Sequence, residues 1–324
     1  MKHPFPRHPL RFPFAAAGCV CAGILASACR DLRGGARAPT DPREEIARCE
    51  EARTDDGGLL ESLLSNGTEP IRERAAVALG RLPFPEAGET VTHALCAASK
   101  DASSSVRTAA VFALGMRVDP AAAEALLAAR SDSDERVRAR VVEAASRIDE
   151  PRMHRLVLEA LQDTTEVVRQ EGAIGPSRWK RDAPDAAEVD AALAAAASEQ
   201  QDGEVAWRAL FSLARRHSAK ASSAFESGLS SSDPRARIFG AQGSRFVPYE
   251  SSSSEKLRAA LADADWRVAC EAALAAAGRP NHMFSLTEIK RPYWLNSLFL
   301  RFFLRLVTTL GHILFTEGKL AKAE

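Results

Sequence analysis

Residues 71–80 read IRERAAVALG and residues 106–115 read VRTAAVFALG, so the chain carries one ten-residue pattern twice, 35 positions apart. In each copy an apolar residue precedes an arginine. Alanine stands three positions after that arginine, and Ala-Leu-Gly stands six to eight positions after it. Alanine is the best helix former and lets neighbouring helices approach closely. The pattern therefore predicts repeated, slim helices that pack together.

The arginine of this pattern defines a register that continues along the chain. Its steps lie between 30 and 37 residues, and small or apolar residues recur three and six positions after it. A fixed period with small residues at fixed offsets is typical of a solenoid. The register positions are Arg72, Arg107, Arg138, Arg169, Ala206, Arg237 and Arg267.

Each unit shows two helical segments separated by a short polar turn. About a dozen residues before the register lie apolar segments such as LLESLL (59–64) and MHRLVLEAL (153–161). Asp, Ser or Thr in the turn can accept hydrogen bonds from the free N–H groups that open the second helix. The repeating unit is thus predicted to be helix, capped turn, helix.

Two units depart from the pattern. The fourth reads RQEGAIGPSRW (169–179), in which Pro176 predicts a shortened second helix followed by a long loop over 176–186. The sixth is glycine-rich and runs into PYESSSSE (248–255), which predicts a flexible connection. We expect the array to bend at these two places.

The turn acid, the Val-Arg pair and the A-x-x-A-L-G run resemble the HEAT repeat family, in particular its short, phycobilin-lyase-like form. The resemblance implies an all-α, right-handed α-solenoid of about seven helix pairs over residues 57–280. It also implies that the register arginines hydrogen-bond the turn acid of a neighbouring unit as an internal ladder; a ligand-binding role is the alternative. The predicted ladder comprises Arg72, Arg107, Arg138, Arg169, Arg237 and Arg267.

The predicted second helices carry an excess of positive charge. Their seven windows sum to +10, whereas the chain without residues 1–28 has a formal net charge of −3. The resemblance implies that these helices line a concave face, so we expect a basic stripe that binds an acidic or extended protein. Arginines that only face solvent and the helix dipole are the alternative. The candidate binding residues are Arg74, Arg140, Arg215 and Arg245.

The first 28 residues are predicted to be a signal peptide, because a basic start is followed by a short apolar segment (12–25) and Ala-Ser-Ala. The stretch LASAC (25–29) resembles a bacterial lipobox, which implies lipidation of Cys29; soluble secretion is the alternative. We therefore expect an exported lipoprotein of the cell envelope, anchored in the membrane and facing the periplasm. Residues 29–56 are expected to form a linker and an N-terminal capping helix.

The C-terminal part, residues 281–324, has a different composition. No alanine occurs from 281 to 316, and YWLNSLFLRFFLRLVTTLGHILF (293–315) is nearly long enough to cross a membrane. Arg301 and Arg305 belong to one narrow polar stripe on this otherwise apolar helix. Such a helix suits a membrane interface or a groove. A capping helix of the solenoid, a true membrane span and a tail that is not native to the array are the alternatives.

The cysteines outside the leader and three tryptophans are expected to be structural. Without CxxC or metal spacing, the cysteines are predicted to be buried core residues, and a bridge between Cys49 and Cys96 is the alternative. The tryptophans are predicted to pack between repeats, and exposed aromatic anchors are the alternative. These residues are Cys49, Cys96, Cys270, Trp179, Trp207 and Trp266.

Catalytic motifs are missing from the sequence. It contains no His-Glu pair of the deoxyhypusine hydroxylase type, and no G-x-S-x-G, H-E-x-x-H or Walker loop. His93, His154 and His217 are isolated and are expected to be solvated or structural. We therefore predict no cofactor and no metal. A net charge of zero also argues against a dedicated nucleic-acid binder.

Together these features favour a non-enzymatic protein-binding scaffold with an unidentified, acidic protein partner and a membrane contact. The alternative is an enzyme-associated array. This would be either a lyase-type subunit or the repeat arm of a cyclophilin-type prolyl isomerase without its catalytic domain.

Overall fold

The computed structural model describes residues 41–82, 88–198, 203–248 and 251–277. Every regular element in these ranges is a helix, and no strand occurs in them. The chain divides after Glu45; of the N-terminal unit only residues 41–45 are described, and they lie at the start of helix α2, Pro42–Ala52. The described part is therefore all-α, as the sequence predicts.

Seven helix pairs follow α2 in the described ranges, which confirms the predicted solenoid. The first helices are α3 (Leu59–Asn66), α5 (Gly88–Ala98), α7 (Ala123–Ala129), α9 (Pro151–Glu159), α11 (Ala186–Ser198), α13 (Ser222–Leu229) and α15 (Ser251–Ala260). The second helices are α4 (Glu69–Arg81), α6 (Ser104–Arg117), α8 (Glu135–Ala145), α10 (Glu166–Ile174), α12 (Gly203–Arg216), α14 (Pro234–Gly243) and α16 (Trp266–Ala277). Short 3₁₀ helices extend three of these elements: η1 (Pro120–Ala122), η2 (Ala160–Gln162) and η3 (Gly175–Arg178).

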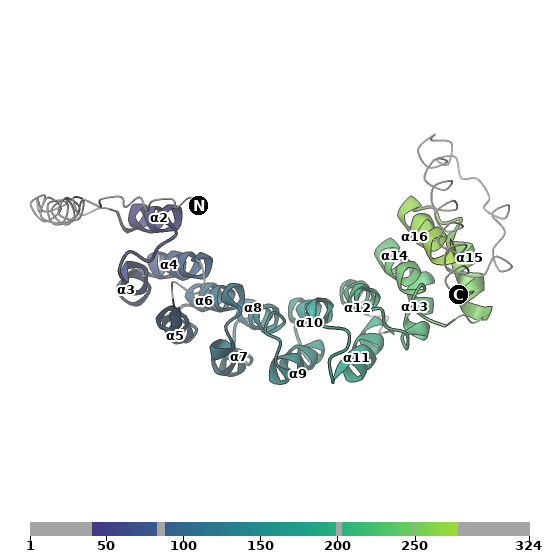
Figure 1. The fold of residues 1–324 in the computed structure, drawn as a ribbon, viewed down its shortest axis with the longest axis horizontal. Coiled ribbons are helices and arrows are strands. Elements are labelled where there is room, and N and C mark those ends of the chain that lie inside the picture. Colours follow the sequence, from purple (N-terminus) through teal and green to yellow (C-terminus); the bar gives the residue numbers. More distant parts are fainter. Residues whose placement is uncertain (1–40, 83–87, 199–202, 249–250, 278–324) are drawn as a thin grey trace, which may run out of the picture. The chain divides into compact units, whose positions relative to one another are not determined.

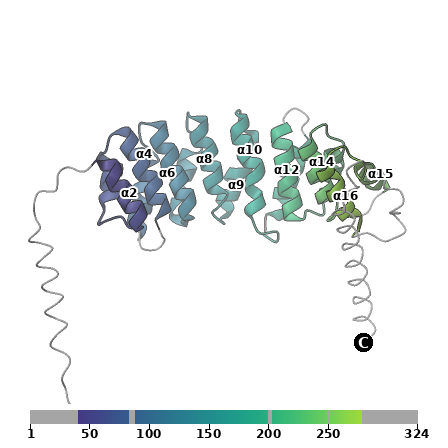
Figure 2. The same cartoon turned by 90° about the horizontal axis from the view of Figure 1, so that it is seen from above.

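The second helices form one layer of the array and the first helices form another (Figures 1 and 2). Helices α4, α6, α8, α10, α12, α14 and α16 contact one another in that order. In the other layer, contacts join α3 to α5, α7 to α9, and α11 to α13 and on to α15. We call the first of these the second-helix layer, and it is the continuous one.

The Ala-Leu-Gly run allows neighbouring second helices to approach closely. A Cβ placed on Gly80 would lie 2.7 Å from Cα of Ala113, and one on Gly115 would lie 2.8 Å from Cα of Ala144. A real side chain cannot occupy either position unless the backbone moves. The glycine eight positions after one register arginine therefore packs against the alanine six positions after the next.

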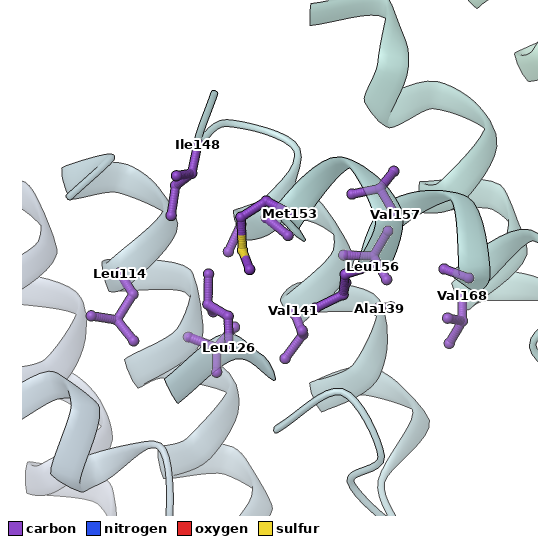
Figure 3. Close-up of a cluster of buried hydrophobic side chains, with 14 of the residues drawn as sticks. Leu114, Leu126, Ala139, Val141, Ile148, Met153, Leu156, Val157 and Val168 are labelled. Atoms are coloured by element: carbon purple, nitrogen blue, oxygen red, sulfur yellow. The ribbon is translucent and has the colours of Figure 1, made fainter. Parts of the chain in front are cut away.

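Larger apolar side chains fill the space between the two layers. Leu126 and Met153 come from first helices, and Figure 3 shows them in one cluster with Leu114 and Val141 from second helices. All four are fully buried. Burial of each such side chain stabilises the fold by about 1.5–3 kcal/mol, far more than an alanine can contribute. These residues therefore supply most of the apolar stabilisation, and the alanines set the spacing.

The two irregular units behave differently from one another. Helix α10 ends at Ile174 and α11 begins only at Ala186, which confirms the predicted shortening at Pro176. The flexible connection predicted for 248–255 is wrong in its second half, because residues 251–254 form the first turn of α15.

Several predictions concern segments outside the described residues. Cys29 and the signal peptide lie before residue 41, and Arg301, Arg305 and their helix lie after residue 277, so they remain predictions. Within the described ranges, no helix combines the length and the hydropathy that a membrane span requires.

Candidate protein-binding surface

Four register arginines form the predicted ladder. Each donates through Nε and Nη2 to both carboxylate oxygens of the turn aspartate in the next unit, at 2.7–3.0 Å. Each also donates through Nη1 to a backbone carbonyl of its own turn. The arginines thus join successive turns and are structural. The pairs are Arg72–Asp101, Arg107–Asp132, Arg138–Asp163 and Arg237–Asp263.

The ladder keeps its carboxylates ionised. Hydrogen bonds from the arginines hold the pKa of Asp101, Asp132 and Asp163 below the ordinary value for aspartate. Each of these carboxylates also accepts a hydrogen bond from the backbone N–H two residues further on, at 2.8–2.9 Å. These three turn acids therefore pair with the ladder arginines. Helix capping is done by other aspartates, and the side chains of Asp134 and Asp233 cap the helices α8 and α14.

Two other register positions continue or interrupt the ladder. Arg169 donates to the carbonyl oxygens of Asp163 and Thr164, as the other register arginines do in their own turns. Ala206 offers no guanidinium, and the residue 25 positions after it, where Arg107 and Arg138 find their aspartates, is Ser231. Both partners of the rung are therefore missing at this junction.

The prediction for Arg267 is wrong. This arginine pairs with Asp265 in its own turn, through Nε at 3.1 Å and Nη2 at 2.6 Å. In three other units the ladder arginine stands six positions after the turn acid. The turn acid of this unit is Asp263, so its ladder position is occupied by Ala269. The buried Val268 stands before that position, as Val137 does in the third unit. The last unit therefore has no ladder arginine.

Carboxylates pair with three of the four candidate binding arginines, two of them from another helix and one, Glu143, from the same helix α8. The pairs are Arg74–Glu50, Arg140–Glu143 and Arg245–Glu271. Arg215 is exposed in the last turn of α12, and no carboxylate of the described residues lies within ion-pair distance of it. The formal charge of the second helices therefore overstates the charge that this layer offers a partner.

An aromatic cluster occupies the second-helix layer on α12 and α14. The rings of Trp207 and Phe239 are stacked with centroids 6.0 Å apart, and Phe211 meets Phe239 edge to face at 5.2 Å. All three side chains are only partly buried. We name Trp207, Phe211 and Phe239 the aromatic cluster. In the sequence only Trp207 stands out, because the phenylalanines become its neighbours only when α12 and α14 pack together.

Cations and one carboxylate hold the aromatic cluster in place. The guanidinium carbon of Arg208 lies 4.3 Å from the centroid of the Trp207 ring, a favourable cation–π geometry. Glu204 accepts hydrogen bonds from Arg235, Arg208 and the indole Nε1 of Trp207 at 2.6–3.1 Å. These hydrogen bonds, above all the one from Arg235, lower the pKa of Glu204 to about 2. The tryptophan is therefore held in one orientation before any partner binds.

The other tryptophans differ from each other. Trp179 is buried, donates from Nε1 to the carbonyl oxygen of Ser146 at 3.0 Å and stacks on His154 with centroids 4.0 Å apart. His154 is itself buried, and its Nδ1 lies 2.7 Å from a carboxylate oxygen of Asp185, so its structural role is confirmed. Trp266 is 58% exposed, so the packing expected for it is wrong.

The residue equivalent to Trp179 is buried in every repeat for which it is described. This shared burial is not evident from the sequence. The position follows the register position by ten residues and closes the end of each second helix. Its occupants include two arginines, and Arg216 pairs there with Asp190 of the first helix at 2.7 Å. A mixture of arginines and apolar residues hides the common burial from sequence inspection. The residues are Leu82, Arg117, Ile148, Trp179, Arg216 and Val247.

The described residues contain neither a disulfide nor a metal-binding cluster. Cys49, Cys96 and Cys270 are free thiols, so the alternative of a Cys49–Cys96 bridge is not formed. Burial raises the pKa of the Cys96 and Cys270 thiols, which makes them poor nucleophiles. No group of three His, Cys, Asp or Glu side chains in the described ranges is placed to hold a metal ion.

Comparisons with known proteins support the repeat interpretation. Residues 92–175 match the family of HEAT repeats. The YibA protein of E. coli is similar over 87% of this chain and 100% of its own, at 16% identity and a TM-score of 0.54. Importin β is similar over 79% of this chain and 40% of its own, at 14% identity and a TM-score of 0.53.

An engineered protein is similar over 81% of this chain and 76% of its own, at 21% identity and a TM-score of 0.50. A search of curated proteins found no match to the chain. Identities this low establish the fold alone, and the lyase-like subtype remains a prediction. The described part of the chain is an all-α solenoid, and its residues 92–175 match the model of HEAT repeats.

Proposed function

We propose that the chain is a non-enzymatic protein-binding scaffold of the bacterial cell envelope. The observation that carries this proposal is the aromatic cluster, which lies partly exposed on the continuous second-helix layer and is held rigid by Glu204 and Arg208. Tryptophan and arginine dominate the residues that contribute most to protein–protein binding. Repeat solenoids present extended surfaces of this kind to their partners.

The distribution of ion pairs agrees with this proposal. Four register arginines and several other arginines of the second-helix layer form ion pairs within the protein. Arg215, one turn beyond Phe211 on α12, is exposed and has no carboxylate of the described residues within ion-pair distance. An uncompensated arginine one helical turn from an aromatic side chain suits a partner segment that carries both apolar and acidic residues.

The first prediction locates the partner on this layer. A photo-crosslinking benzoylphenylalanine at position 215 is expected to give a discrete adduct in cells that express the full chain naturally. The matched control carries the same group in place of Arg155, an exposed arginine of first helix α9. Adducts of equal yield from both positions, or none from position 215, would contradict the proposal.

The second prediction concerns the envelope. Cys29→Ser is expected to abolish incorporation of a labelled fatty acid into the chain, because lipidation requires the thiol. Cys49→Ser is the matched control and is expected to keep the label, since Cys49 is a buried core residue. Persistent labelling of Cys29→Ser would exclude the lipoprotein anchor. It would leave the scaffold proposal to the crosslinking result.

A further inference from the structure

A cleft opens where the fourth unit departs from the repeat. Helix α10 gives way at Gly175 to the 3₁₀ turn η3, and Trp179 follows in an extended conformation with φ −83° and ψ 158°. A space of about 300 Å³ lies between η3 and the end of α8. Its walls are formed by Ser146, Arg147, Asp149, Arg178, Trp179 and Lys180.

The walls carry more positive than negative charge. Lys180 Nζ lies 3.0 Å from a carboxylate oxygen of Asp149, the one acid in the walls. Arg147 donates to Glu143 at 2.9 Å, but Glu143 also accepts from Arg140 and cannot compensate both guanidinium groups fully. The cleft therefore keeps a net positive charge.

Arg178 is the cation that the surrounding residues compensate least. It is exposed, and its Nη1 donates to a neutral group, the Oγ of Ser146, at 3.0 Å. No carboxylate of the described residues lies within ion-pair distance of it. Glu171 interacts electrostatically with Arg178 but also with Arg140 and Arg208, so its charge is shared among three guanidinium groups.

The cleft is rigid. Trp179 is tied to α8 by its hydrogen bond to the carbonyl oxygen of Ser146 and to α9 by its stacking on His154. His154 is in turn hydrogen-bonded to Asp185 at the end of the loop. A site whose walls do not need to be ordered on binding loses less conformational entropy when it is occupied.

Size and chemistry point to a single acidic side chain. A volume of about 300 Å³ is at the lower limit of ligand pockets, too small for a folded element. Arginine forms its strongest hydrogen bonds with carboxylates, to which it can donate two at once. Helix α12, which carries Trp207 and Phe211, contacts η3, so the aromatic cluster and the cleft belong to neighbouring elements.

We propose that this cleft binds the carboxylate of an aspartate or glutamate side chain in an extended segment of the protein partner, with Arg178 as the main ion-pair donor. This inference rests on the proposed scaffold function and assigns the partner's chemistry at one place. Lys180, whose Nζ lies 3.0 Å from Asp149 in the same walls, supplies a second cation for the bound carboxylate. Ser146 Oγ instead accepts from Arg178 and donates to the carbonyl oxygen of Glu143 at 2.7 Å, which holds Arg178 at the cleft.

The test uses the full chain and a fluorescent hexaglutamate peptide with both ends blocked. Arg178→Gln is expected to raise the Kd of the peptide about tenfold, and Lys180→Gln several-fold. Arg130→Gln, at the exposed end of α7 and outside the cleft, removes the same charge as Arg178→Gln and is expected to leave the Kd unchanged. Lys180 is 75% exposed, so its variant reports on binding even if Arg178→Gln unfolds.

Four results would overturn the inference. The first two are that hexaglutamine binds as tightly as the hexaglutamate peptide, either with both ends blocked or with a free C-terminal carboxylate. The third is that millimolar phosphate displaces the hexaglutamate peptide as readily as glutamate does. The fourth is that Arg178→Gln and Arg130→Gln bind the hexaglutamate peptide with the same Kd. Failure of the scaffold proposal is distinguishable. If the crosslink from position 215 persists when the peptide result is negative, the scaffold stands and the cleft assignment falls. If the peptide result is positive without any crosslink, the scaffold proposal falls.

Discussion

Arg138→Ala is expected to lower the free energy of unfolding by about 2–4 kcal/mol, because it removes several charge-assisted hydrogen bonds and leaves Asp163 without its cation. Arg138 donates to both carboxylate oxygens of Asp163, to Oγ1 of Thr165 and to the carbonyl oxygen of Asp132. The side chains of this pair are only 15% and 17% exposed, so water replaces the lost bonds incompletely. Urea denaturation of the full chain, followed by circular dichroism, measures the change.

The chain offers its own control for this rung. Asp163→Ser added to Arg138→Ala recreates the junction of Ala206 and Ser231, where both partners are missing. The double variant is therefore expected to be more stable than Arg138→Ala alone, since it no longer holds an unpaired carboxylate. Arg152→Ala breaks exposed ion pairs with Glu124 and Glu150 and is expected to cost less than about 1 kcal/mol. Equal costs for Arg138→Ala and Arg152→Ala would contradict a stabilising ladder.

The same rung gives the unfolding free energy a pH dependence of known sign. The folded-state pKa of Asp163 lies below that of the unfolded chain, because Arg138 donates hydrogen bonds to its carboxylate. The stabilisation is thus fully present above the unfolded pKa of about 4 and is lost as the pH falls through the folded pKa. Below about pH 4 the wild type is expected to lose stability more steeply than Arg138→Ala. Parallel curves would show that this pair does not act through ionisation.

Gly115→Val is expected to destabilise the fold by about 3 kcal/mol, the upper part of the usual range for overpacking. A Cβ at this position would lie 2.8 Å from both Cα and Cβ of Ala144, so α6 and α8 must separate to accept it. Valine keeps the helix more readily than glycine does, so the loss comes from helix packing and not from helix propensity. Thermal and urea unfolding of the full chain measure it.

The control for Gly115→Val is Gly203→Val, because a Cβ at Gly203 would meet no atom within 4 Å. That variant is expected to change the unfolding free energy by less than about 1 kcal/mol. Gly115→Ala is expected to lie between the two. If Gly115→Val were as stable as Gly203→Val, close packing at the Ala-Leu-Gly run would not determine the spacing of the second helices.

Local periodicity was enough to predict most of the fold. The repeat of Arg72 and Arg107 predicted the helix pairs and two ladder rungs, because the same residues meet the same neighbours in each unit. Pro176 predicted the end of α10, since proline has no N–H group to donate. The error at Arg267 arose from following the nearest arginine, although the turn acid Asp263 and the buried Val268 already indicated the correct register.

The charge on the second-helix layer could not be predicted in the same way. Arg74 is compensated by Glu50 and Arg245 by Glu271, partners on other helices and 24 and 26 residues distant in sequence. Counting charges on second helices cannot show which of them meet a carboxylate. The expected basic stripe was based on such a count, whereas in the structure only some of these arginines, Arg178 and Arg215 among them, have no carboxylate of the described residues within ion-pair distance.

By itself, the sequence determined the repeating unit, its irregular fourth member and the residue type of each ladder position, because these follow from spacing along a helix and from the period of the array. The tertiary structure alone decided which cations stay uncompensated, which aromatic rings form a cluster and where a cleft opens. Those properties depend on the distance and rotation between neighbouring helices, which side-chain packing sets and no local pattern records.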